Sequence, residues 1–352
     1  MTPSLPTYRD LKTHLQARFG ERVHRVTVRG GFTCPNRDGR CGTEGCAYCS
    51  PEVAAAPRRS DPRNQDAAGA RPAESEAPSQ PIEPADVVRQ LHVGMERVGG
   101  RFAAQKFLAY FNDYTATYDT VHRLRGLFFA ALKPPPVVGL AVGTRPDTLP
   151  DEVVALLREL HEKTYLWVEL GLQTANDDTL RRLGRGHDSK AFEEAVKQMG
   201  RAGIRVRAHV ILGLPGETPT DDQNTAYLLS HLPVCGVKIH NLHILEGSPW
   251  AKAYRKGKLR AISQAEYVTR TVDFLERLPS HVVVHRLVAS APRRWLIAPE
   301  WCLKKNSALE AIRKALQTRR SWQGKALGAP IEAVSENLAS PKPRLGSTKK
   351  PG

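Results

Sequence analysis

The chain has 352 residues, of which 41% are hydrophobic, so it is long enough to form one large domain or two smaller ones around a sizeable core. No apolar run approaches the length that spans a bilayer, and charges interrupt the apolar pattern of the first twenty residues, so we expect neither a membrane span nor a secretory signal. The formal net charge of +16 is compatible with nucleic-acid binding, but it is equally compatible with simple solubility because the charges are spread along the chain.

Strands and helices alternate through the ordered part of the chain. The pattern predicts strands over 23–28, 106–111, 137–142, 165–170, 205–212, 236–242 and 282–287. It predicts helices over 84–98, 117–132, 151–163, 190–202, 220–231 and 263–278. Strands rich in Val, Ile and Leu that alternate with helices are typical of parallel βα units. The fold class is therefore α/β, with six βα units before the last strand.

Two segments lack the residues that form a core. Positions 54–81 contain no Val, Ile, Leu, Met, Cys or aromatic residue and are dominated by Ala, Pro, Arg, Ser and Glu, so we expect a disordered insertion there. The segment 325–352 is rich in Pro, Gly, Ser and Lys and predicts a disordered basic tail. The domain organisation that follows is a helical lead-in over 1–22, a barrel over 23–290 and a C-terminal extension over 291–324.

Polar and glycine residues follow almost every predicted strand. Examples are the segments 30–34, 112–115, 143–147, 171–174, 213–218 and 243–248. In a parallel barrel the loops after the strands share one rim, where binding and catalytic residues lie. Many of these residues could instead simply turn the chain and cap helices.

Four of the six cysteines fall in one glycine-rich loop, at positions 34, 41, 46 and 49. Cysteines grouped in this way usually bind a metal ion or an iron–sulfur cluster. Ligation by Cys34, Cys46 and Cys49 would leave one iron of a four-iron cluster without a protein ligand, whereas ligation by all four would suit a closed zinc site. The spacing alone leaves both alternatives open. With few cysteines and no export signal, we expect a reducing, cytoplasmic environment.

The motifs in combination resemble the radical S-adenosylmethionine (radical SAM) superfamily, and more closely its YhcC-type branch, which is related to the Elongator catalytic subunit. The matching segments are 30–39, 45–49, 109–111, 142–147, 169–174, 185–188 and 213–217. The resemblance spans roughly residues 8 to 305 and implies a partial (β/α)6 TIM-like barrel with a short C-terminal extension. It also implies a [4Fe–4S] cluster on Cys34, Cys46 and Cys49, because Cys41 has no counterpart in that branch.

The resemblance implies contacts to S-adenosylmethionine (SAM) from the ends of strands two, four and five. Asn112 and Asp113 match a turn that receives the methionine amino group, although the usual glycines are missing here. Gln173 matches a residue near the ribose and carboxylate, and Arg185 matches a partner of the methionine carboxylate. His209 stands where some relatives place an acidic residue on the ribose. Gly213 belongs to a motif that packs on adenine.

Several of these side chains have ordinary alternatives. Arg185 could cap a helix or pair with a surface carboxylate. Glu169 could form a buried ion pair with Arg145. Lys238 and the histidines near it could face the interior and touch substrate, or could be satisfied core residues. The roles of Cys41, Cys235 and Cys302 are left open, and no residue is assigned as catalytic.

The implied reaction is reductive cleavage of SAM to a 5′-deoxyadenosyl radical that takes a hydrogen atom from the substrate. Such an enzyme needs an electron donor such as flavodoxin or ferredoxin. The Elongator group modifies tRNA uridines, so tRNA is a candidate partner and RNA modification a candidate function. The alternatives are a radical SAM enzyme that acts on a small metabolite or peptide, and a zinc-stabilised nucleic-acid-binding protein.

Overall fold

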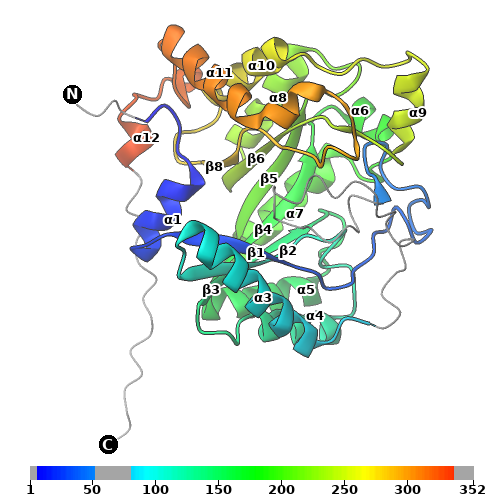
Figure 1. The fold of residues 1–352 in the computed structure, drawn as a ribbon, viewed down its shortest axis with the longest axis vertical. Coiled ribbons are helices and arrows are strands. Elements are labelled where there is room, and N and C mark those ends of the chain that lie inside the picture. The colour runs from blue at the N-terminus through cyan, green and yellow to red at the C-terminus, as the bar shows by residue number, and fades with distance from the viewer. Residues whose placement is uncertain (1–5, 52–80, 337–352) are drawn as a thin grey trace, which may run out of the picture.

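The computed structural model describes residues 6–51 and 81–336 (Figure 1). Its centre is a seven-stranded parallel sheet in the order β1-β2-β3-β4-β5-β6-β8, which curls into a half-barrel. The strands are β1 (Val23–Val28), β2 (Lys106–Phe111), β3 (Val137–Thr144), β4 (Tyr165–Gln173), β5 (Arg205–Leu212), β6 (Val234–Asn241) and β8 (Val283–Arg286). Neighbouring strands of the sheet follow one another in the chain, except that β6 pairs with β8. The sheet is therefore the partial (β/α)6 barrel that the sequence predicts, extended by one more strand.

Helices cover the outer face of the sheet. The helices that follow the strands in turn are α3 (Pro84–Phe102), α4 (Val121–Ala131), α5 (Asp151–Lys163), α6 (Asp177–Arg182), α7 (Ser189–Arg201), α8 (Pro219–Ser230), α9 (Pro249–Arg255) and α10 (Gln264–Glu276). Their buried side chains and those of the strands form one large apolar core, which includes Leu91, Phe128, Leu166 and Phe192. This outer core therefore holds the sheet in its curved form.

The narrow end of the half-barrel is closed by the N-terminal helix α1 (Leu11–Phe19). Asp10 caps this helix by accepting a hydrogen bond from the Thr13 amide, and Leu15 packs on Tyr165 and Trp167 of the inner sheet face. The amide of Val284 donates to the carbonyl of Arg9 at 2.7 Å, which ties the segment before α1 to strand β8. The opposite rim, where the strands end, stays available for loops that carry function.

A C-terminal extension packs beside the last strand. It consists of the short strand β9 (Leu296–Ala298), the 3-10 helix η2 (Glu300–Lys304), the helix α11 (Lys305–Thr318), the 3-10 helix η3 (Lys325–Leu327) and the helix α12 (Ala333–Glu336). Strand β9 pairs with the short strand β7 (Ile244–Leu245), which follows β6 in the chain. Helix α11 packs against α10, and its buried Ile312 and Leu316 belong to the main core.

Two sequence predictions differ from the structure. The helix predicted from 117 begins at Val121, because the Thr120 hydroxyl caps it while Thr117 hydrogen-bonds to Thr144 and Thr148 instead. The tail predicted to be disordered from 325 forms η3 and α12 over its first part, where Val334 is buried. The predicted insertion up to residue 80 and the end of the tail from residue 337 lie outside the described residues.

Candidate functional site

The cysteine loop follows β1 at the wide rim of the half-barrel and is folded by its own backbone hydrogen bonds. The Cys41 amide donates to the carbonyl of Pro35 at 2.7 Å, and the Cys49 amide donates to that of Cys46 at 2.8 Å. Cys46 is buried, Cys34 and Cys49 are half-buried, and Cys41 is exposed. The three cysteines predicted as ligands are thus the three that the fold at least partly encloses.

Nitrogen donors surround two of these thiols. Asn36 Nδ2 lies 3.1 Å and Arg185 Nη1 lies 3.4 Å from Cys46 Sγ, and Arg37 Nη2 lies 3.3 Å from Cys49 Sγ. Burial raises the pKa of the Cys46 thiol, but the Arg185 charge and these hydrogen bonds outweigh burial and leave the pKa below its ordinary value. For Cys49 burial prevails over Arg37 and the pKa is raised. The environment of Cys46 therefore favours a thiolate.

Sequence reasoning did not assign roles to Asn36 and Arg37. Both belong to the segment 30–39 that carries the family resemblance, but nothing in the sequence shows that their side chains turn back toward the sulfurs. Asn36 is only 2% exposed, and its Nδ2 also donates to the Gly184 carbonyl at 2.7 Å. This amide therefore joins the cysteine loop to the loop after α6.

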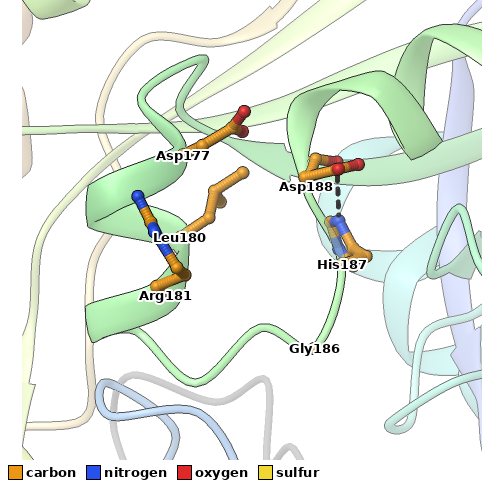
Figure 2. A pocket seen from close by; sticks show the side chains of 6 residues that line it. All are labelled: Asp177, Leu180, Arg181, Gly186, His187 and Asp188. Carbon is orange, nitrogen blue, oxygen red and sulfur yellow. Dashed lines mark hydrogen bonds between the residues drawn. The ribbon is translucent and has the colours of Figure 1, made fainter.

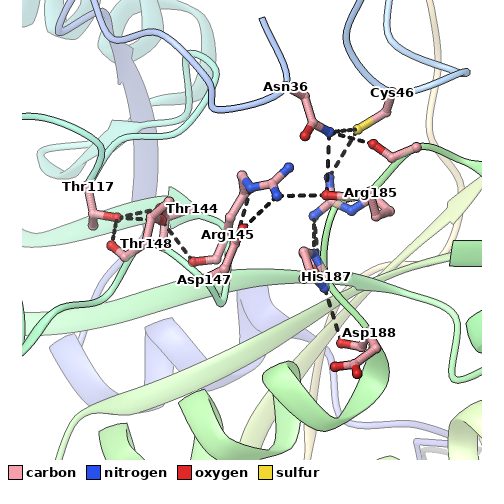
Figure 3. A network of polar contacts seen from close by, with 12 residues as sticks. Asn36, Cys46, Thr117, Thr144, Arg145, Asp147, Thr148, Arg185, His187 and Asp188 are labelled. Atoms are coloured by element: carbon pink, nitrogen blue, oxygen red, sulfur yellow. Dashed lines mark hydrogen bonds and ion pairs between the residues drawn. The ribbon is translucent and has the colours of Figure 1, made fainter. Parts of the chain in front are cut away.

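Arg185 connects the cysteine loop with the end of β4 (Figure 3). Its Nη2 donates to the Gly171 carbonyl at 3.0 Å and lies 2.9 Å from His187 Nε2, while Nη1 lies 3.3 Å from the Tyr48 hydroxyl. Its Nε is buried and has no hydrogen-bond partner among the described residues. Arg185 therefore does not form the surface ion pair that was the alternative to ligand binding. Its Nε is the donor that is left for a ligand.

Arg145 has a supporting position in the same network (Figure 3). It binds Asp147 through two hydrogen bonds of 2.9 and 2.7 Å, and its Nη2 donates to the Arg185 carbonyl at 2.6 Å. The expected ion pair between Arg145 and Glu169 is wrong, because Asp147 occupies the guanidinium and Glu169 points to other partners. Arg145 thus fixes the backbone of the residue that faces Cys46.

Gln173 ends strand β4 in a strained conformation. Its φ of 75° lies in the left-handed region, and the pairing of β4 with β5 shifts between Gly171 and Gln173. The side chain is 4% exposed, yet its Oε1 is buried without a hydrogen-bond partner among the described residues. An unsatisfied amide next to Arg185 is consistent with the SAM contact predicted for Gln173.

Asp113 organises the backbone that leads into the cysteine loop. Its Oδ2 accepts hydrogen bonds from the amides of Gly30 at 3.0 Å, Gly31 at 2.9 Å and Phe32 at 3.3 Å. Burial nevertheless raises the pKa of this carboxyl. Oδ1 alone is without a partner, so at most one oxygen serves the predicted contact to the methionine amino group. The neighbouring Asn112 is half-buried.

Gly213 follows β5 at the edge of a cavity of about 280 Å³, which is lined by Gly213, Leu214, Pro215, Gly216, Glu217, Lys258, Leu259, Arg260, Ile262, Glu266 and Arg270. Its φ is 81°, and a Cβ atom there would come within 2.9 Å of Ile262. Only glycine therefore fits both the turn and the close approach of Ile262. The contact between Gly213 and adenine that the resemblance implies stays a prediction.

A second cavity of about 440 Å³ lies between α6 and the loop that follows Arg185 (Figure 2). It is lined by Asp177, Leu180, Arg181, Gly186, His187 and Asp188, and the Asp188 carbonyl lies 3.2 Å from His187 Nδ1. Burial and the Arg185 charge lower the pKa of His187 to about 3, so this imidazole is neutral. Sequence reasoning did not predict this cavity, because its walls come from a short helix and a loop.

The interior of the half-barrel holds a charged network. The Tyr110 hydroxyl donates to Glu169 Oε2 at 2.5 Å, and Lys238 Nζ donates to the same oxygen at 2.8 Å. His209 lies nearby on β5; burial lowers its pKa, and its Nε2 has no partner in the part of the chain that the structure describes. The inward orientation predicted for Lys238 is confirmed.

The chemistry of the donors fits an iron–sulfur cluster. Within 6–51 and 81–336, no three His, Cys, Asp or Glu side chains gather closely enough to hold a single metal ion. A cluster makes a different demand, because each thiolate binds a different iron and the sulfurs need not converge on one point. Hydrogen bonds to the ligating sulfurs, such as those from Asn36 and Arg37, are a feature of such sites.

In the same residues no helix is long and apolar enough to cross a membrane.

Comparison with known proteins gives two family matches. Residues 38–229 match the model of the radical SAM superfamily, and residues 234–318 match that of the radical SAM C-terminal domain. The chain is 40% identical to the uncharacterized protein YtqA of Bacillus subtilis over 90% of this chain and 92% of that protein. It is 37% identical to the protein YhcC of Escherichia coli over 90% of this chain and 94% of that protein.

More distant matches lie in the Elongator group. The chain is 23% identical to a tRNA uridine(34) acetyltransferase of Dehalococcoides mccartyi over 78% of this chain and 61% of that protein. The solved structure of Elp3 from Methanocaldococcus infernus, with an N-terminal deletion, superposes with a TM-score of 0.58 at 15% identity, over 86% of this chain and 64% of that one. This structural likeness concerns the fold.

Proposed function

The chain belongs to the radical SAM superfamily, in its YhcC-type branch, and we propose that Cys34, Cys46 and Cys49 hold a [4Fe–4S] cluster at which SAM binds. The observation that carries this proposal is the enclosure of Cys46 by Asn36 and Arg185, since a buried thiol with two nitrogen donors is suited to be a ligated thiolate. When bound, such a cluster supplies the electron for reductive cleavage of SAM, from which a hydrogen-abstracting deoxyadenosyl radical arises.

The residues of this chain have separate tasks in the proposal. Arg185 is close to Cys46 and keeps one buried donor free, so it is suited to orient the SAM carboxylate. Gln173 offers its buried Oε1 from the neighbouring strand end. Gly213 lets the turn after β5 pack closely on Ile262, and both residues line the smaller cavity, where a flat base can pack. Asp113 holds the approach to the loop rigid through three backbone amides.

We further propose RNA modification, with tRNA as the substrate. Support comes from the net charge of +16 and from the similarity to a protein named as a tRNA uridine(34) acetyltransferase. Contacts between basic side chains and phosphates would make RNA binding strongly dependent on salt. If the substrate is a small metabolite or a peptide, the protein should not bind total tRNA in this salt-dependent way.

The cluster proposal is tested by iron and acid-labile sulfide analysis of anaerobically purified protein. We expect about four irons per chain and a brown colour. Cys46→Ala should abolish both, whereas Cys41→Ala, at the exposed cysteine of the same loop, should retain them. A colourless protein with one zinc, or bleaching by Cys41→Ala, contradicts the assignment.

The substrate proposal is tested by an anaerobic assay of 5′-deoxyadenosine with dithionite, with and without total tRNA. We expect SAM cleavage in both and faster cleavage with tRNA, together with a new mass on a tRNA nucleoside. Cleavage that tRNA neither accelerates nor couples to a new nucleoside contradicts an RNA substrate while leaving the cluster proposal intact.

A further inference from the structure

Three basic side chains gather inside the half-barrel, from the two edge strands of the sheet and from the strand next to one of them. Arg25 comes from β1, Lys238 from β6 and Arg286 from β8; we refer to these three as the inner basic cluster. Lys238 and Arg286 are paired in register across β6 and β8, so they share one face of the sheet. Arg25 lies 3.6 Å and Lys238 lies 2.8 Å from the carboxylate of Glu169.

The charges of this region do not balance. Among the described residues, Glu169 is the acidic side chain that ion-pairs with members of the inner basic cluster. One carboxylate faces two arginines and a lysine, so positive charge exceeds negative charge in this largely buried region even when Lys238 is neutral. Burial and the neighbouring Arg25 charge lower the pKa of Arg286 to about 10, although Tyr110 and Glu169 oppose the change. Burial also lowers the pKa of Lys238 to about 7, against the opposing effect of Glu169.

Donor atoms around the cluster lack acceptors in the described part of the chain. Arg286 Nη2 and Arg25 Nη1 are buried without a hydrogen-bond partner, although Arg25 Nη1 lies within ion-pair distance of Glu169. Arg286 Nε makes one long contact of 3.4 Å to the Ile239 carbonyl. Buried donors are normally satisfied, so a group of them beside uncompensated cations points to an acceptor that is not part of the chain.

The position of the cluster relates it to the cofactor site. Glu169, its anchor, is two residues before Gly171 on the same strand, and the Gly171 carbonyl accepts from Arg185. Two residues along a strand correspond to about 7 Å, so the cluster lies one layer deeper in the barrel than Arg185. Arg25 keeps 28% of its side chain exposed, which leaves the cluster open toward the β1 edge.

We propose that the inner basic cluster binds an oxyanion of the substrate, a phosphate or a carboxylate, and so places the adjoining part of that substrate next to the bound SAM. Two arginine forks and a lysine match the oxygens of such a group. This proposal rests on the proposed radical SAM function, because it names the chemical class of the substrate that this enzyme would use. It concerns residues distinct from Arg185 and Gln173, which face SAM.

Anion binding is measured on anaerobically reconstituted holoprotein by the midpoint of thermal unfolding. Inorganic phosphate and succinate are titrated separately at constant ionic strength set with chloride, so that general screening is equal in all samples. We expect at least one of the two anions to raise the midpoint by several degrees at millimolar concentration. The more effective anion identifies a phosphate-bearing or a carboxylate-bearing substrate.

Variants assign the effect to the cluster. Arg286→Gln and, independently, the partly exposed Arg25→Gln should each raise the half-saturating anion concentration at least tenfold. Arg255→Gln, which removes an arginine of an exposed pair with Glu246, should leave it unchanged. Arg286→Gln should also raise the midpoint of unfolding without anion, because it removes one of the crowded charges; an arginine with a purely structural role would lower that midpoint.

Three results would overturn the inference. They are the absence of an anion effect in the wild-type holoprotein, a change of less than threefold in both cluster variants, and competition between SAM and the anion, which would place the SAM carboxylate itself at the cluster. Iron content and 5′-deoxyadenosine formation in the same preparations report on the proposed function separately. A protein that binds the anion but does not cleave SAM would keep this inference and lose that function.

Discussion

The two faces of the central sheet carry different kinds of side chains. On β4 the side chains of Leu166, Val168 and Leu170 are fully buried in the apolar core on the outer face. Between them Trp167 and Glu169 point inward, where Trp167 Nε1 donates to Glu169 Oε1 at 3.2 Å. The outer face needs apolar volume, which many sequences supply, whereas the inner face needs particular charges at particular places. Along this one strand, the residues that face outward thus stabilise the fold, and those that face inward belong to the site.

The largest effect on stability is expected from the inner face. Glu169→Gln removes the carboxylate that Lys238 and Arg25 share and leaves buried cations unpaired, which should destabilise the protein by about 3–5 kcal/mol. Urea unfolding of the anaerobic protein measures the change. Glu159→Gln, which breaks an exposed pair with Arg125, should cost at most about 1 kcal/mol.

A double variant tests whether the loss comes from the charges. Glu169→Gln combined with Lys238→Met should be less destabilised than the sum of the two single variants, because the pair is then removed together. Additive effects would contradict the description of the inner face as a coupled network.

The outer face should respond to lost volume alone. Leu166→Ala is expected to cost about 2–5 kcal/mol through lost burial and the cavity left behind, with iron content unchanged once the protein is folded. Leu327→Ala, at an exposed leucine, should be nearly neutral in the same unfolding experiment. A selective loss of iron in Leu166→Ala would show that the two faces are less separate than described.

Substitution of two glycines compares the rim of the half-barrel with an ordinary turn. Gly213→Ala and Gly257→Ala both place a side chain at positive φ, which costs about 1–2 kcal/mol, but only at Gly213 would the new Cβ approach Ile262 within 2.9 Å. Gly213→Ala should therefore be the more destabilising of the two and should also weaken SAM binding, as equilibrium dialysis of the holoprotein would show. Equal effects on stability and on binding would argue against a ligand surface at Gly213.

The smallest effect at neutral pH is expected at the closed end of the barrel, where the change appears only as the pH falls. Burial and nearby arginines lower the pKa of His14 to about 3, from about 6.5 in the unfolded chain. The unfolded state therefore binds the proton first as the pH falls, so His14 contributes stability that is present above pH 6.5 and declines toward pH 3, by up to about 1.4 kcal/mol per pH unit. His14→Gln should flatten this part of the unfolding free energy against pH, and an unchanged slope would contradict the assignment.

The sequence predicted the architecture well because hydrophobic alternation directly reflects the two faces. All seven strands of the half-barrel were predicted close to their observed bounds, and family motifs placed Gln173 and Gly213 at strand ends. Helix starts were less accurate where a capping threonine decides the boundary, as Thr120 does for α4. The site residues remain predictions that the geometry accommodates.

Contacts between segments distant in sequence could not be predicted. Nothing in the local pattern shows that Arg145 reaches the Arg185 carbonyl, or that Asn36 bridges Cys46 and the loop after α6. The inner basic cluster is of the same kind, since Arg25 and Arg286 belong to opposite ends of the chain and meet only because the sheet curls. Such residues become visible only once the curvature of the sheet is known.

The most direct test of the central claim is the electron paramagnetic resonance spectrum of dithionite-reduced protein, recorded with and without SAM. With three cysteine ligands and one iron free of protein, the spectrum should be that of a reduced four-iron cluster and should change when SAM is added, in the wild type and in Cys41→Ala alike. A cluster spectrum that SAM leaves unaltered, or the absence of any cluster signal, would contradict the account.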